Sequence, residues 1–217
     1  MLKPKLVIGN KNYSTWSLRP WLLLAYFDVD FDEENVSLNA AGLARRLGQY
    51  SPTCRVPVLI DGETTVWDSL AICEFANEKY LDGRGWPQSL TRRAYARALS
   101  AEMHAGFTAL RSALPMNLRA RRRVALTDEV RRDITRIDAI WRDCEGPWLC
   151  GEFSIADCMY APVAMRFPTY NIELSPGAET YANQLRNLGA MQRWVEAALK
   201  ETEIIAEDEA GEEARDT

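Results

Sequence analysis

Three short polar segments in the first third of the chain could bind or activate a small molecule. The first, Tyr13-Ser14-Thr15-Trp16-Ser17, connects an apolar run over residues 5–8 to a helical pattern that begins at Ser17. In α/β sheets, ligands collect beyond the carboxyl ends of the strands, and a helix N-terminus presents unpaired N–H groups with a partial positive charge. A serine hydroxyl here could donate a hydrogen bond to a bound anion. It could equally do no more than cap the helix, and the segment alone leaves both interpretations open.

The second and third segments are Val56-Pro57 and Asp68-Ser69. Proline removes a donor from a strand, so Pro57 is expected at a strand start or edge. A cis bond before it would free the Val56 backbone for a ligand, although X-Pro bonds are mostly trans. Asp68-Ser69 closes a hairpin pattern and opens a helical one. Either residue can cap that helix, or the helix N-terminus can bind an anion while Asp68 accepts a hydrogen bond from a ligand amine.

Two polar pairs in the second half of the chain have simpler structural explanations. Ser154 and Asp157 have the spacing of a capping box at the start of an apolar helix, so we assign Asp157 to stability. His104 precedes Arg111 by two turns on one predicted helix face and could act as a general base. Because spacing assigns it no partner, a packed or hydrogen-bonded histidine is the simpler interpretation.

The cysteines and the single histidine give no sign of a metal site or a disulfide framework. The five cysteines form no CxxC pair, so we predict reduced thiols and no metal. The longest apolar run, residues 21–27, is too short to span a bilayer, and the N-terminus lacks the apolar stretch of a secretory signal. We therefore expect a cytoplasmic protein without a membrane partner.

Charge is unevenly distributed along the 217 residues, whose net charge is −5. Acidic residues crowd the end of the chain, where Arg215 is the only basic residue after position 200. This composition predicts an acidic, solvated and disordered tail over residues 201–217, although an interaction segment could have the same composition. The basic cluster at 119–123 has no interleaved aromatic residues, so nucleic-acid binding is not predicted.

Hydrophobic periodicity shows which elements must position these residues, and it changes near residue 82. Before that point, strand and helix patterns alternate and end in a hairpin that turns at Asp61-Gly62. Beyond it only helical patterns recur, over residues 95–114, 128–142, 155–167, 178–187 and 190–199. We predict an α/β domain with a mixed sheet over 1–81, a linker over 82–88 and an all-helical domain over 89–200.

The order and spacing of these segments resemble the glutathione transferase superfamily over residues 4–200. The matching segments are Tyr13 to Arg19, Arg55 to Leu59 with Asp61-Gly62, Asp68 to Ile72, and Gly151 through Asp157 to Pro162. The resemblance implies a thioredoxin-like N-terminal domain, an all-helical C-terminal domain and a homodimer. It also implies two substrates, glutathione and a small hydrophobic electrophile.

The resemblance further implies roles for individual residues. Pro57 is then cis, the Val56 backbone pairs with the cysteinyl part of glutathione, and Arg55 contacts the peptide. Asp68 and Ser69 hold the γ-glutamyl amine and carboxylate. The electrophile is expected against the predicted helix over 95–114, at Met103, His104, Phe107 and Arg111.

The first segment is most similar to the serine-type, zeta-like branch, in which Ser-Ser-Cys precedes the helix. Ser14 takes the position of the serine that hydrogen-bonds the glutathione sulfur, with Ser17 as the alternative donor. Trp16 replaces the cysteine, which argues against maleylacetoacetate isomerase activity. A free thiol has a pKa near 8.5 and reacts as the thiolate, so a donor hydroxyl and the helix N-terminus would both favour the reactive form.

A protein that keeps this fold as a non-catalytic interaction or regulatory module is the alternative function. Such modules commonly lose the sulfur contact or the acid–serine pair. This sequence retains Ser14 and Asp68-Ser69, so the sequence favours an enzyme that activates glutathione for detoxification or isomerase-type chemistry.

Overall fold

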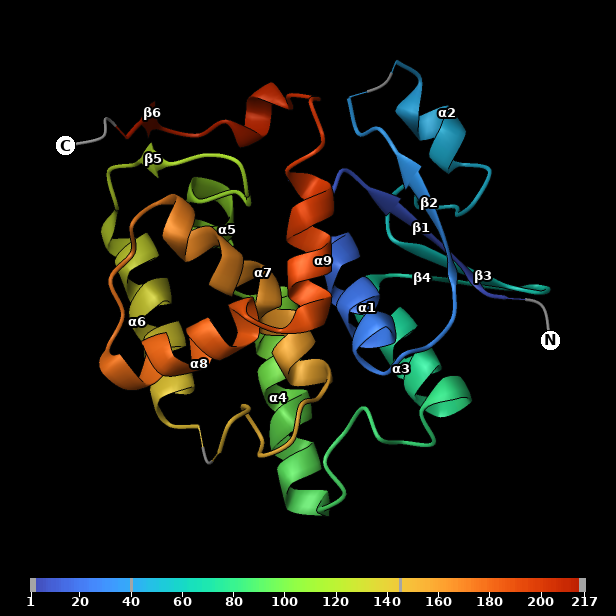
Figure 1. Cartoon of the computed structure of the whole chain (residues 1–217), viewed down its shortest axis with the longest axis horizontal. Coiled ribbons are helices and arrows are strands. Elements are labelled where there is room, and N and C mark those ends of the chain that lie inside the picture. Colours follow the sequence, from blue (N-terminus) through green and yellow to red (C-terminus); the bar gives the residue numbers. More distant parts are fainter. Residues whose placement is uncertain (1–2, 40, 145, 215–217) are drawn as a thin grey trace.

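A computed structural model describes residues 3–39, 41–144 and 146–214, and its N-terminal part is built on a four-stranded mixed sheet (Figure 1). The strand order is β2-β1-β3-β4, with bounds of Lys5–Gly9 for β1, Asp32–Val36 for β2, Val58–Asp61 for β3 and Thr64–Trp67 for β4. β1 runs parallel to β2 and antiparallel to β3, which forms the predicted hairpin with β4. The predicted mixed sheet is confirmed.

The alternation of side chains along the strands divides the N-terminal core between the two faces of the sheet. Leu6 and Ile8 of β1 pack in the main core beneath α1 (Thr15–Tyr26) and α3 (Ser69–Tyr80). Val7 points the other way, into a small cluster with Leu47 of α2 (Leu43–Leu47). Because both faces are covered, β1 is buried over most of its length.

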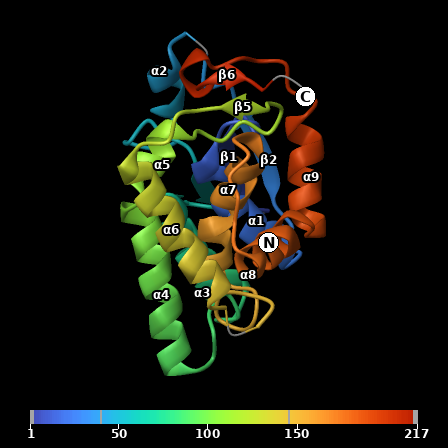
Figure 2. The same cartoon turned by 90° about the vertical axis from the view of Figure 1, so that its left-hand side faces the viewer.

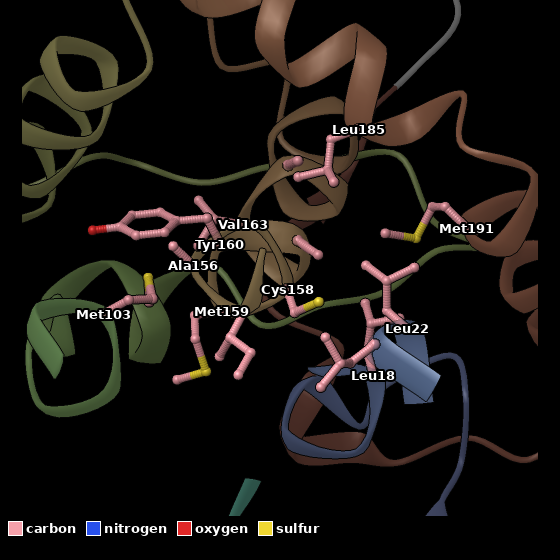
Figure 3. Close-up of a cluster of buried hydrophobic side chains, with 14 of the residues drawn as sticks. Leu18, Leu22, Met103, Ala156, Cys158, Met159, Tyr160, Val163, Leu185 and Met191 are labelled. Atoms are coloured by element: carbon pink, nitrogen blue, oxygen red, sulfur yellow. The ribbon is translucent and has the colours of Figure 1, made fainter. Parts of the chain in front are cut away.

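Helices make up most of the chain after α3, and α7 lies at their centre. Their bounds are Leu90–Ala105 for α4, Thr108–Ala113 for α5, Asp128–Arg142 for α6, Ile155–Thr169 for α7, Pro176–Arg186 for α8 and Gly189–Ala198 for α9. α7 packs against α1, α4 and α8, and Figure 3 shows its Cys158, Met159 and Tyr160 among side chains from those neighbours. The predicted helical second half is confirmed.

The start of α7 confirms the predicted capping box. Asp157 is fully buried and accepts hydrogen bonds from the Ser154 N–H at 2.8 Å and the Ser154 hydroxyl at 3.1 Å. Its other oxygen accepts from the Leu149 N–H and the Tyr181 hydroxyl, both at 3.0 Å. The carboxylate therefore joins the start of α7 to the loop before it and to α8.

One long helix predicted over residues 95–114 is wrong, because the structure divides it at Gly106 and Phe107. Gly106 is extended (φ −101°, ψ −165°) and Phe107 has a positive φ of 55°. A Cβ at Gly106 would lie 2.7 Å from the Glu102 carbonyl oxygen, so only glycine fits this break. The break starts the separate helix α5, which carries Arg111.

The disordered tail predicted over residues 201–217 is also wrong for the part that the structure describes, residues 201–214, which we call the C-terminal segment. It contacts Ser37 and Asn39, which precede α2, and ends in β6 (Glu212–Glu213), which pairs with β5 (Arg122–Arg123) (Figures 1 and 2). Glu201 accepts hydrogen bonds from the N–H groups of Lys11 and Asn12, at 2.8 and 3.0 Å. The acidic residues are thus held by polar groups from other parts of the chain; residues 215–217 lie outside the described residues.

Candidate functional site

Two adjoining cavities lie where the loop after β1 meets α1. The sheet-side cavity, of about 670 Å³, is lined by Pro57, Asp68 and Ser69, with His104 from α4. The helix-side cavity, of about 470 Å³, is lined by Ser14 on one side and by residues of α5, α7 and the C-terminal segment on the other. Trp16, Arg55 and Val56 line both cavities. A molecule of a few residues could therefore extend from one cavity into the other.

Ser14 stands at the N-terminus of α1 with its hydroxyl available to the helix-side cavity. It is the N-cap residue, yet its side chain makes no capping hydrogen bond. Its hydroxyl instead donates to Ser17 Oγ over 2.7 Å, and Ser17 Oγ also accepts from the Gly9 N–H at 3.1 Å. Ser17 is fully buried and lines neither cavity, whereas Ser14 lines the helix-side one. Of the two serines, only Ser14 therefore borders a cavity.

Val56 presents its backbone where the two cavities meet. The Val56–Pro57 peptide bond is cis, as the resemblance implies, and β3 begins only at Val58. Among the described residues, neither the N–H nor the C=O of Val56 has a hydrogen-bond partner. One extended peptide could pair with both groups.

Asp68 divides its two carboxylate oxygens between the helix and the sheet-side cavity. Oδ1 accepts from the N–H groups of Leu70 at 2.9 Å and Ala71 at 3.4 Å, which makes Asp68 the cap of α3. Oδ2 lies 3.3 Å from His104 Nε2. The capping and ligand-binding interpretations of Asp68 are therefore compatible, because each uses a different oxygen.

Trp16 forms the partition between the cavities and is held by two arginines. The guanidinium of Arg19 lies 4.3 Å from its ring centroid and that of Arg111 lies 4.7 Å from it. His104 meets the same ring edge-on at 5.3 Å. Cation–π contacts of this kind fix the plane of the ring, so the position of Trp16 depends on α1, α4 and α5 together.

Arg19 is a buried cation beneath the sheet-side cavity. It is 2% exposed, and its Nη1 donates to Ser69 Oγ at 3.5 Å. Burial, together with the positive charges of Arg111 and Arg166, lowers the pKa of Arg19 to about 9. Its positive charge is close enough to the cavity wall to attract an anion bound at Ser69.

The four residues predicted to meet an electrophile do not lie together. Arg111 lines the helix-side cavity and His104 lines the sheet-side one. The prediction is wrong for Met103 and Phe107: Met103 is fully buried in the core shown in Figure 3, and Phe107 packs against the ring of Tyr160. The break after α4 turns Phe107 inward, which the assumption of one continuous helix could not show.

Sequence reasoning missed four residues that shape the cavities: Trp16 as the partition, Arg19, Arg166 and Asp208. Arg19 and Arg166 had a signal that went unused. Each is an arginine inside an otherwise apolar helical stretch, and arginines are almost never fully buried unless they have a charged partner. Asp208 had none, because its segment was predicted to be solvated. Among the described residues, no group of three or more His, Cys, Asp or Glu side chains could hold a metal ion.

Comparison with known proteins places this site in a family. Residues 13–79 match the model of the glutathione S-transferase N-terminal domain. A probable maleylacetoacetate isomerase from Caenorhabditis elegans is 24% identical over 180 residues, 80% of this chain and 83% of that protein. Residues 13–79 are a glutathione S-transferase N-terminal domain. This domain includes Ser14, Val56-Pro57 and Asp68-Ser69, so these cavity residues lie within the part that the family shares.

Two further similarities cover different extents of this chain. A dichloromethane dehalogenase from Methylorubrum extorquens is 47% identical over 60 residues, which are 27% of this chain and only 20% of that protein. A glutathione transferase homologue from Burkholderia, solved with bound glutathione, has a TM-score of 0.71 at 21% identity and covers 91% of this chain and 98% of its own. The structural similarity confirms the fold, a thioredoxin-like domain followed by helices. No helix in the described part of the chain is long and apolar enough to cross a membrane.

Proposed function

We propose that this chain is a glutathione-dependent transferase of the serine type, in which Ser14 donates a hydrogen bond to the glutathione sulfur. The observation that carries the proposal is the meeting of an available Ser14 hydroxyl and the unpaired Val56 backbone where the two cavities join. In this arrangement the cysteinyl part of glutathione pairs with Val56. Its γ-glutamyl part enters the sheet-side cavity, and the sulfur faces the helix-side one.

The γ-glutamyl group has a matching partner for each of its charges. Its amine meets Asp68 Oδ2, the oxygen that does not cap α3. Its carboxylate meets Ser69 at the N-terminus of α3, where the Ser69 N–H has no hydrogen-bond partner among the described residues and the buried Arg19 beneath Ser69 attracts an anion. Arg55, which borders both cavities, is free to contact the peptide between them.

The paired serines supply the chemistry at the sulfur. A hydroxyl can rotate its proton, so Ser14 can turn from Ser17 to the sulfur while Ser17 donates to Ser14. The Gly9 N–H, which donates to Ser17 Oγ, polarises this chain of hydroxyls toward the sulfur. The hydrogen bond and the N-terminus of α1 both stabilise the thiolate, and the thiol proton leaves to solvent. The thiolate then forms a carbon–sulfur bond to the electrophile, whose leaving group departs with the electron pair of the broken bond.

The relatives support glutathione chemistry without fixing the reaction. The names of the C. elegans isomerase and the bacterial dehalogenase belong to different reactions. Trp16, in place of a cysteine, continues to argue against the isomerase. The homodimer implied by the resemblance and the cytoplasmic location expected from the sequence stay predictions; sedimentation of a single species of monomer mass at micromolar concentration would refute the dimer.

Calorimetric titration with glutathione, followed by a conjugation assay with an activated aryl halide, tests the proposal. We expect saturable binding and turnover, with Asp68→Asn weakening binding at least tenfold because the amine loses a charged partner. Asp143→Asn, a change of the same kind at an exposed surface position, should leave both unchanged. Binding without turnover, or no binding at all, would contradict the proposal and favour the non-catalytic module.

A further inference from the structure

The helix-side cavity has a positively charged end that glutathione binding, as proposed above, does not use. Arg111 of α5 and Arg166 of α7 line this end, with Thr108 and Ser112 beside them. The two arginines come from different helices and converge on one cavity in a chain whose net charge is negative. Their convergence needs a physical explanation, because two cations near each other repel.

Arg166 is the more unusual of the two. It is 4% exposed and interrupts a helix whose other residues are mostly apolar and buried. Its Nε is buried without a hydrogen-bond partner, and among the described residues no ion pair reaches its guanidinium. Burial, with the charge of Arg111, lowers the pKa of Arg166 to about 10. A buried arginine without a partner is costly to the fold, so a charge that arrives with a ligand would explain its presence.

Backbone carbonyl oxygens hold one nitrogen of the Arg111 guanidinium, and its other N–H donors stay available to the cavity. Its Nη1 donates to the carbonyl oxygens of His104 and Gly106, both at 3.2 Å. These bonds use the free carbonyls at the break between α4 and α5, and they hold the guanidinium against Trp16. Because a guanidinium carries five N–H donors, Arg111 can still bind an anion beside Arg166.

One acidic side chain lines the cavity, Asp208 of the C-terminal segment. Burial raises the pKa of Asp208, and the charge of Arg166 opposes that rise. No ion pair within 4.0 Å joins Asp208 to either arginine in the described part of the chain. The carboxylate therefore faces the arginines without neutralising them, and an anion between them would compete with it.

We propose that Arg111 and Arg166 form an anion subsite for the second substrate, so that the electrophile carries a carboxylate on the part that enters the helix-side cavity. This inference rests on the proposed function and replaces the expectation of a purely hydrophobic electrophile. The cavity, of about 470 Å³, suits a molecule of one substituted ring. The glycyl carboxylate of glutathione is the other source of an anion. α2 supplies an apolar part of the cavity wall, at Leu43 and Leu47.

A pair of unreactive probes tests the subsite without requiring catalysis. 3,5-Dinitrobenzoate and 3,5-dinitrobenzamide have nearly the same shape, and only the first is charged. We expect calorimetry to show that the wild type binds the benzoate at least tenfold more tightly than the amide, as a charge-assisted hydrogen bond allows. Arg166→Gln and Arg111→Gln should each bring the two affinities within threefold. Asp208→Asn should tighten benzoate binding several-fold, while Arg142→Gln, at an exposed position, should change neither.

Each outcome bears on the proposal. If Arg166→Gln does not fold, Arg111→Gln and Asp208→Asn still move benzoate binding in opposite directions. Equal binding of the two probes by the wild type, no binding of either, or a benzoate preference that survives all the variants overturns the subsite. Arg166→Gln weakening glutathione but not benzoate also overturns it, because the anion is then the glycyl carboxylate. If the wild type binds no glutathione, the proposed function is overturned. The ratio of the affinities for the benzoate and the amide still tests the subsite in that case.

Discussion

The sheet-side and helix-side cavities use positive charge in opposite ways. Arg55 borders both cavities, but the second cation of the sheet-side cavity, Arg19, is buried behind Trp16 and Ser69, so a ligand does not contact its guanidinium. In the helix-side cavity the cations Arg111 and Arg166 are the wall itself. We infer from this difference that fixed backbone groups recognise glutathione, whereas side chains from several helices recognise the electrophile.

The largest effect on the free energy of unfolding is expected at Asp157, which holds the start of α7 in place. Asp157→Ala removes the acceptor of four hydrogen bonds inside the core, and each buried donor left without a partner costs about 1–3 kcal/mol. Urea denaturation should show a loss of about 3 kcal/mol or more in the free energy of unfolding, against almost none for Asp143→Ala. Glutathione affinity of the folded fraction should stay near the wild-type value. A stable variant that has lost glutathione binding would show that Asp157 belongs to the site.

A smaller effect on stability is expected from removing Arg19, the buried cation behind the wall of the sheet-side cavity. Because burial lowers the pKa of Arg19 to about 9, the folded state disfavours its charge at neutral pH. Arg19→Met should therefore change the free energy of unfolding by no more than about 1 kcal/mol, whereas breaking a buried ion pair costs about 3–5 kcal/mol. Glutathione should bind roughly tenfold more weakly, since the anion loses a nearby charge.

Thermal or urea denaturation and calorimetry measure the two effects on one preparation. Arg193→Met, on the exposed face of α9, is the matched control and should alter neither. A large loss of stability with unchanged glutathione affinity would assign Arg19 to the fold alone.

The smallest effect concerns the C-terminal segment, which contributes Asp208 to the wall of the helix-side cavity. Hydrogen bonds from Ser37 and Asn10 lower the pKa of Glu203 from 4.5. Burial opposes a similar change at Glu209, but hydrogen bonds from Tyr13 and Asn117 together with the charge and hydrogen bond of Arg122 outweigh it, so the pKa of Glu209 is also lowered from 4.5. Acids with lowered pKa values stabilise the docked segment above pH 4.5 and lose that contribution as the pH falls below it.

Amide NMR spectra recorded between pH 7 and pH 3.5 measure this docking directly. Signals of residues 203–213 should move toward disordered positions below about pH 4.5, before the rest of the spectrum changes. Glu203→Gln should weaken docking already at neutral pH, and Glu207→Gln, at an exposed position of the same segment, should not. A segment that stays docked throughout the titration would show that these two carboxylates do not hold it.

The sheet-side half could be predicted from sequence because its parts are local. The turn at Asp61-Gly62, the start of β3 after Pro57 and the cap at Asp68 each depend on neighbouring residues. Turn and cap preferences read such features directly. Ser14 followed from its place between β1 and α1, and only its choice over Ser17 needed the buried position of Ser17.

The helix-side half could not be predicted because tertiary packing assembles it. Arg111 and Arg166 are 55 positions apart in sequence, and periodicity carries no information about such a pairing. The break at Gly106 also reversed the expected facing of Phe107. The acidic end and the basic cluster at 119–123 were each interpreted alone, whereas the structure joins Glu209 to Arg122 in an ion pair and sets β5 opposite the acidic strand β6. Charge complementarity between distant segments was the available signal.

The pKa of the thiol in bound glutathione tests the central claim most directly. Thiolate absorbance recorded against pH should give a pKa below the free value near 8.5 in the wild type. Ser14→Ala keeps the Val56 backbone and Asp68-Ser69, so glutathione should still bind. The loss of one charge-assisted hydrogen bond, worth about 1.5–3 kcal/mol, should raise that pKa by about one to two units. Ser17→Ala should raise it less, because Ser17 acts only through Ser14. An unchanged titration in Ser14→Ala would contradict the serine mechanism, and a larger shift in Ser17→Ala would assign the sulfur donor to Ser17.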